Sequence, residues 1–89
     1  MKNASIFLTH KGRKLDPELC HQLAETLISI RLNHQKYLSS DKQTRAETIT
    51  THLAERHILM RKSEDIEDAL GIHPLGYDME ALIDWHLAS

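Results

Sequence analysis

The sequence predicts a small all-α domain of three to four helices with a short extended N-terminal arm. Gly occurs three times and Pro twice in 89 residues, whereas Leu, Ile, Ala and Glu are plentiful. Aromatic residues, which strands favour, make up only 4% of the chain. Apolar residues recur at helical spacing, and the stretches that carry them begin with residue types that cap helices.

We expect a single domain over residues 1–89. It divides into an arm and turn (1–15), two main helices (16–62) and an acidic helical segment (63–89). A chain of this length buries only somewhat more than about 60% of its unfolded surface, so its core is thin and association with another chain would help it. A hydrophobic content of 40% and a charged content of 27% are ordinary for a globular protein and argue against disorder.

The first segment, residues 4–9, is apolar enough to form a short strand or an arm, and Gly12 permits a turn after it. It is too short for a signal-peptide core or a membrane span. Cys20 is the single cysteine and cannot form an internal disulfide, so we expect a small buried thiol. The lack of a disulfide framework favours a reducing compartment, and we expect a cytoplasmic protein without membrane association.

The first main helix has a clear start. Asp16 can cap it, Pro17 suits its first position and Glu18 favours the positive end of the helix dipole. Seven residues fall within one sector about 100° wide, the width of a core stripe: Leu19, Leu23, Leu27, Ile30, His34, Tyr37 and Leu38. Ile28 and Leu32 lie on roughly the opposite side. A helix with two apolar faces is wrapped by its own chain or packs on another subunit.

A second helix is expected to start near residues 39–41, since Ser40 and Gln43 have the spacing of a capping box. Its apolar stripe comprises Ala46, Ile49, Leu53 and Met60. Arg56 interrupts this stripe and Ile58 lies on the reverse face. The helix therefore bends near Glu55, or its end is buried on several sides.

Two shorter helices are expected in the acidic segment. Ser63 is the expected cap of one that runs over 64–70 and stops at Gly71. The last starts near Asp78 and runs toward Leu87, with Trp85 at the edge of its apolar side.

Charge is divided sharply along the chain. Residues 1–62 hold all 11 Lys and Arg residues against six acids, a net charge of +5. Residues 63–89 hold seven acids and no Lys or Arg, a net charge of −7, so the total of −2 hides a strong asymmetry. Such an asymmetry bears on the choice of partners more than on the fold.

The reactive residue types do not fall into catalytic or metal-binding spacings. His52 and His57 are five residues apart and diverge by about 140°, unlike the i, i+4 histidine pair of zinc hydrolases. Cys20 and His21 are adjacent on a helix and point about 100° apart, so they do not form a nucleophilic dyad. We expect a protein that is not an enzyme and that binds no metal or other cofactor.

Residues 64–72 resemble the first helix and turn of a helix-turn-helix, which ends in a similar Leu-Gly-Ile. Glu67, however, stands where that motif usually places a small residue between its helices. The helix that follows carries Asp78, Glu80 and Asp84, which a phosphate backbone repels. The resemblance therefore does not imply that this segment contacts DNA.

The composition favours a small regulatory protein that binds a protein partner through helical surfaces, as many accessory proteins of bacteria and phages do. The expected partner-binding residues are apolar or aromatic and lie off the main stripes or within the acidic segment: Tyr77, Trp85, Ile28, Leu32 and Ile58. We expect a homodimer as well, because the acidic segment of one chain complements the basic helices of another.

The alternative is a dimeric DNA-binding transcriptional regulator. Lys11, Arg13 and Lys14 form one dense basic cluster, which is typical of an arm that contacts phosphates. Pairing of residues 6–9 across a dimer would add a two-stranded ribbon, a known DNA-reading device.

Overall fold

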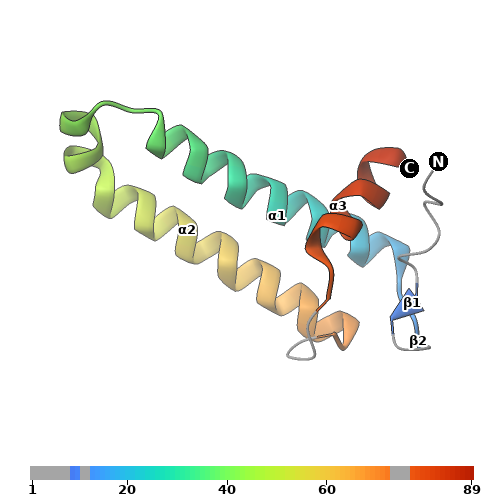
Figure 1. Cartoon of the computed structure of the whole chain (residues 1–89). Coiled ribbons are helices and arrows are strands. Elements are labelled where there is room, and N and C mark those ends of the chain that lie inside the picture. The colour runs from blue at the N-terminus through green and yellow to red at the C-terminus, as the bar shows by residue number, and fades with distance from the viewer. Residues whose placement is uncertain (1–8, 11–12, 73–76) are drawn as a thin grey trace.

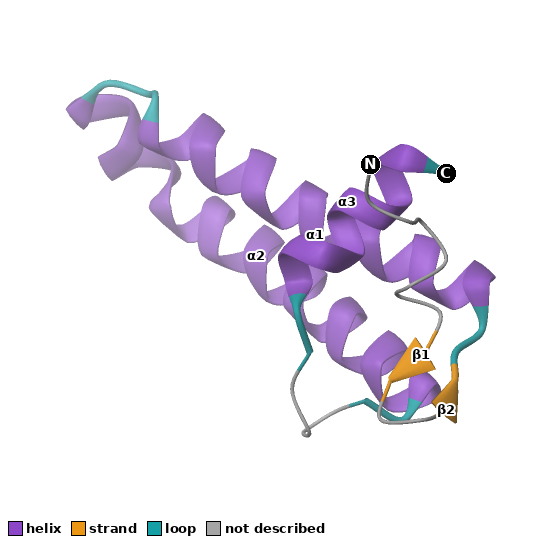
Figure 2. Ribbon diagram, turned by 45° about the vertical axis from the view of Figure 1, so that its right-hand side comes forward, coloured by secondary structure: helices purple, strands orange, loops and turns teal. Residues whose placement is uncertain are grey.

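The computed structural model describes residues 9–10, 13–72 and 77–89, and of Thr9, His10 and Arg13 it describes the backbone alone. The described residues form three helices, α1 (Pro17–Leu38), α2 (Lys42–Leu70) and α3 (Met79–Ala88). The long helices α1 and α2 lie side by side as a hairpin, and α3 packs against α1 near the base of that hairpin (Figures 1 and 2). The result is an elongated all-α molecule of 48 × 29 × 18 Å.

Each helix begins at an aspartate. The carboxylates of Asp16, Asp41 and Asp78 accept hydrogen bonds of 2.7–3.0 Å from backbone N–H groups two or three residues further on. The predicted starts of α1 and α3 are thus confirmed. The capping box expected at Ser40 and Gln43 is not formed, because Asp41 supplies the cap and the Gln43 amide donates to Glu47 instead.

The prediction of a separate short helix after Ser63 was wrong, because α2 continues through this position to Leu70. Ser63 is buried on the inner side of α2, and its hydroxyl donates to the carbonyl of Met60 at 2.7 Å. A serine that bonds back to its own helix in this way need not cap a new one. The stop at Gly71 is confirmed, with this residue in the left-handed conformation at φ 75°.

A two-residue antiparallel pair precedes α1. Strands β1 (Thr9–His10) and β2 (Arg13–Lys14) pair with Thr9 opposite Lys14. Thr9, the last residue of the expected N-terminal strand or arm, thus pairs within its own chain. The rest of that expected strand (4–8) and the expected turn residue Gly12 lie outside the described residues.

The hydrophobic core lies at the base of the hairpin, where α1, α2 and α3 meet. Its buried members are Leu15, Cys20, Leu23, Ala24, Leu27, Ile66, Leu70, Ile72, Leu82, Ile83 and Trp85. All of them come from the base of the hairpin, from α3 or from the segments next to these. None of the described helices is both long and apolar enough to cross a lipid bilayer.

Replacement of Gly71 by Ala should lower the free energy of unfolding by about 1–2 kcal/mol, because a Cβ disfavours the left-handed conformation. Thr50→Ala on the exposed surface of α2 is the control, since Ala is the better helix former and should not destabilise. Urea denaturation followed by circular dichroism measures both variants. Equal stability of Gly71→Ala and the wild type would contradict the assigned helix end.

Cys20 should react slowly with iodoacetamide in the native protein. Burial in the core, and secondarily the nearby Asp16 carboxylate, raise the pKa of its thiol from 9.0 to about 11. The nucleophilic thiolate is therefore scarce at pH 8, and it forms more readily once urea unfolds the chain. Mass spectrometry of time courses with and without urea tests this, and equal rates in the two conditions would contradict it. By the same linkage, ionisation of Cys20 should lower stability as the pH rises from 9 toward 11.

Candidate protein-binding surface

Helix α3 covers only part of the hairpin. Glu80 in its first turn pairs with Arg31 of α1. Near its other end, Nδ1 of His86 lies 2.7 Å from Nδ1 of His21. Helix α3 therefore contacts α1 between His21 and Arg31, and it crosses α1 at a steep angle (Figures 1 and 2). Beyond Arg31 the hairpin continues as two layers only, in the part of the chain that the structure describes (Figures 1 and 2).

A groove with a volume of about 230 Å³ opens between α1 and α2, and its Arg31 pairs with the first turn of α3. Its lining residues are Ile30, Arg31, His34, Gln35 and Arg56. Because Arg31 also holds Glu80, this groove borders α3. An uncovered groove beside exposed apolar side chains is a candidate site for another helix.

Apolar side chains extend this groove toward the tip of the hairpin. At 100° per residue, Ile49, Leu53 and Met60 all lie within about 60° of Arg56 on α2. On α1, Leu38 lies within about 80° of Ile30 by the same geometry. We call this surface the distal face: Ile30, His34, Leu38, Ile49, Leu53, Arg56 and Met60. Leu38 and Leu53 are 53% and 54% exposed there, which is unusual for large apolar residues that share one face.

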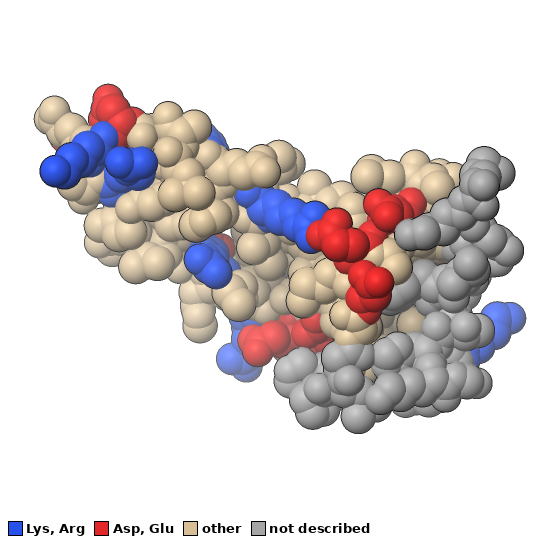
Figure 3. Space-filling model, viewed as in Figure 1, with Lys and Arg blue, Asp and Glu red and all other residues tan. Residues whose placement is uncertain are grey.

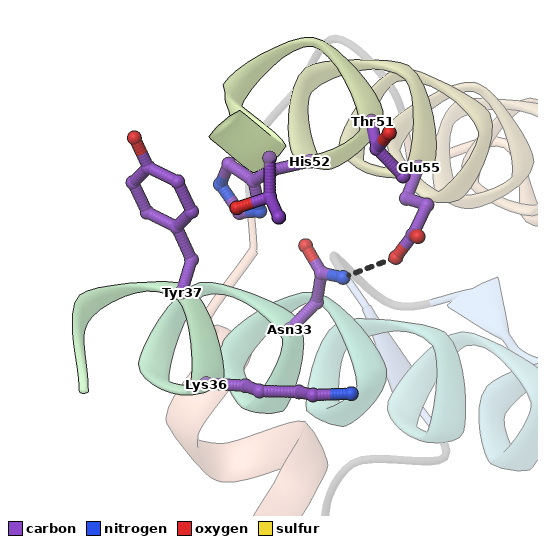
Figure 4. Close-up of a pocket in the computed structure, with 7 residues that line it drawn as sticks. Asn33, Lys36, Tyr37, Thr51, His52 and Glu55 are labelled. Carbon is purple, nitrogen blue, oxygen red and sulfur yellow. Dashed lines mark hydrogen bonds between the residues drawn. The ribbon is translucent and has the colours of Figure 1, made fainter. Parts of the chain in front are cut away.

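Rings and a hydrogen bond join the two helices in this outer half (Figure 4). The rings of Tyr37 and His52 stack with centroids 4.2 Å apart, and the His34 ring lies 5.9 Å from that of His52. The amide of Asn33 donates to the Glu55 carboxylate at 2.8 Å. These contacts set the spacing of α1 and α2 without the aliphatic packing found at the base.

A second pocket, of about 170 Å³, lies on the opposite side of the hairpin around these contacts. Its lining is Asn33, Lys36, Tyr37, Thr48, Thr51, His52 and Glu55 (Figure 4). The Asn33 Oδ1 atom is buried there without a hydrogen bond. The lining combines a cation, a carboxylate and hydroxyls, so it does not select one class of ligand. No three His, Cys, Asp or Glu side chains gather as metal ligands anywhere in the described residues.

Trp85 is buried and Ile28 is partly buried, whereas the sequence predicts both as partner contacts. Trp85 is 5% exposed and stacks on His21 with ring centroids 4.3 Å apart. Ile28 is partly buried and packs against the core. Both changes have one cause, which is that α3 covers this second apolar face of α1. In this part of α1, the second apolar face is covered by the same chain and not by another subunit.

Tyr77 also serves the fold. It lies just before α3, is half-buried, and its hydroxyl donates to Oε2 of the buried Glu67 in α2. Burial, and then this bond to the carboxylate, raise the pKa of Tyr77. The contact fastens the segment that leads into α3 to the second long helix.

Leu32 and Ile58 remain exposed, at 60% and 66%. Each lies about 180° from the apolar stripe of its own helix, so neither belongs to the distal face. The basic cluster proposed for DNA contact is described only in part. Lys14 is exposed, Arg13 is described by its backbone alone, and Lys11 lies outside the described residues.

Sequence reasoning missed the distal face because it assigned those residues to the core. Leu38, Ile49, Leu53 and Met60 follow regular apolar stripes, and such stripes normally face a core. The sequence did contain one signal of this exposure, which is the difference in length between the expected helices. A final helix of about ten residues spans about 15 Å, whereas the expected hairpin helices are at least twice as long.

Charge separates along the long axis of the molecule. The outer half of the hairpin, residues 28–58, carries five basic and three acidic residues. Residues 59–72 and 77–89 at the base carry two basic and seven acidic residues. Figure 3 shows mostly basic side chains over the tip and middle of the hairpin and acidic side chains gathered over α3, where the two signs meet.

Tyr77→Phe should lower the free energy of unfolding by about 1–3 kcal/mol, because it leaves the buried Glu67 carboxylate without this donor. Tyr37→Phe is the matched control, since the Tyr37 hydroxyl makes only a 3.5 Å contact with a carbonyl. Urea denaturation compares the two. If both variants have the same free energy of unfolding as the wild type, the Tyr77–Glu67 contact does not stabilise the fold.

Comparison of the chain with protein-family models, with curated proteins and with solved structures found no match. The site must therefore be interpreted from its own geometry.

Proposed function

We propose that this chain is a non-catalytic regulatory protein that acts by binding a protein partner through the distal face. The observation that carries the proposal is the exposure of Leu38, Ile49, Leu53 and Met60 on one face of the hairpin, beside a groove that α3 leaves open. Helix α3 covers α1 near the base, whereas the outer half has no such cover among the described residues (Figure 1).

The chemistry of the distal face suits a helix supplied by a second chain. Two helices side by side with a groove between them offer a third helix a surface to pack against. The apolar centre at Ile49 and Leu53 is bordered by Arg31 and Arg56. An apolar centre within a charged rim is the usual composition of a protein interface.

Binding would also stabilise the outer half of the hairpin. Thr44, Thr48, Thr50 and Thr51 lower the helix propensity of this part of α2. Helical segments of this length depend on tertiary packing, and here the packing is two-layered. A partner helix would supply the missing layer and would couple its own binding to the order of the hairpin.

Reactive side chains in the described structure have structural contacts, which supports binding rather than catalysis. The Cys20 thiol is buried with a raised pKa, and the Tyr77 hydroxyl bonds to Glu67. The His52 ring is buried in its stack with Tyr37. Each of these groups has a role in the fold.

Leu53→Glu should abolish partner capture, whereas Ile58→Glu should leave it intact. Both residues are exposed on α2, but only Leu53 lies on the distal face. The measurement is affinity capture from a host lysate with tagged wild type and both variants. Captured proteins are identified by mass spectrometry and then titrated as purified proteins by calorimetry. We expect a loss of at least about tenfold in affinity for Leu53→Glu alone.

The control is circular dichroism, in which both variants should show the wild-type helix content. A purified partner that binds Leu53→Glu as tightly as the wild type would refute the proposal. So would salt-sensitive binding of duplex DNA that disappears when Lys11, Arg13 and Lys14 become Ala, without any protein partner. That second outcome is the one the DNA-binding alternative predicts.

A further inference from the structure

We propose that the occupant of the distal face is a second copy of this chain, bound antiparallel, so that the outer halves of two hairpins form a four-helix bundle. This inference rests on the proposed function, because both use the distal face. It adds the identity and the orientation of the partner.

The first argument is charge complementarity on this side of the molecule. Lys42 projects within about 40° of Arg56 on α2, so the tip and middle of the distal face are basic. Helix α3, at the other end of the same side, presents Asp78, Glu80 and Asp84 to solvent (Figure 3). An antiparallel copy brings the basic tip of each chain against the acidic α3 of the other. A parallel copy would place the two basic tips together and the two acidic α3 helices together, so that like charges repel.

The second argument is length. The open part of α2, from Lys42 to Met60, spans about 27 Å at 1.5 Å per residue. A second hairpin laid antiparallel on it covers the same ~27 Å. The open part of each copy can therefore be covered along its whole length by the outer half of the other.

The third argument is register. The midpoint of the open part of α2 lies at Thr51, and a two-fold axis there places Ile49 opposite Leu53 of the second copy. The same axis sets Arg56 opposite the small Ala46, which keeps the two Arg56 side chains apart. A surface that pairs with itself in this way meets the requirement of a symmetric dimer.

Sedimentation equilibrium tests the second copy. The wild type should form a dimer with a dissociation constant in the micromolar range or below. Leu53→Glu should weaken it at least about tenfold, and the equally charged Ile58→Glu should not change it. A wild-type monomer at about 100 µM, or a dimer that Leu53→Glu leaves intact, would overturn the inference.

Charge exchange tests the orientation. Lys42→Glu should weaken the dimer several-fold at low salt, and adding Asp84→Lys in the same chain should restore it. The control is Lys62→Glu, which makes the same change of charge on α2 away from the distal face. Lys42 opens α2, where a glutamate favours the helix, so loss of folding does not explain a loss of dimer. A dimer strengthened by Lys42→Glu would show a parallel arrangement and overturn the proposal.

The two proposals can be refuted independently of each other. A monomeric protein whose identified partner is lost with Leu53→Glu refutes the second copy and supports the proposed function. A dimer insensitive to Leu53→Glu, together with a partner equally insensitive, refutes both.

Discussion

The difference in length between the hairpin and its third helix determines most of what is distinctive in this structure. Helix α2 has 29 residues, whereas α3 has 10. Burial of apolar surface drives folding, and it requires cover on more than one side. Where α3 lies, the chain has a closed core that contains Leu23, Leu82 and Trp85. Where α3 ends, the same apolar pattern continues on the hairpin without a cover.

The outer half is consequently held together by different forces from the base. At the base, aliphatic side chains from three helices contribute of order 25 cal/mol for each Å² of apolar surface that they remove from water. In the outer half, stacked rings at Tyr37 and His52 and the Asn33–Glu55 hydrogen bond join two helices. Such contacts contribute little net free energy each, so this half belongs to the less stable part of the molecule. A partner that covers the outer half would therefore add stability to the part of the molecule that the chain itself stabilises least.

Charge asymmetry along the sequence becomes a spatial asymmetry because of how the chain turns. The basic residues at the tip of the hairpin are carried about 30 Å away from the base by the long helices. The acidic end of α2 and the whole of α3 return to that base, so most of the acids gather at one end (Figure 3). Separation of charge on this scale exceeds the screening length of about 8 Å at physiological salt, so each end presents its own field to a partner. The distal face runs between the two ends, so a partner that binds there is expected to prefer one orientation.

The sequence by itself determined the fold class, the starts of α1 and α3 at Asp16 and Asp78, and the end of α2 at Gly71. These features depend on local chemistry, since a carboxylate or a glycine acts within about four residues of its own position. Only the tertiary structure decided that α2 runs through Ser63, that α3 covers Ile28 and buries Trp85, and that Leu38, Ile49 and Leu53 stay exposed. An apolar stripe shows that a residue favours burial, but whether it is buried depends on which other element reaches it. That depends on the length and path of a helix far away in sequence, and periodicity within one helix contains no information about it.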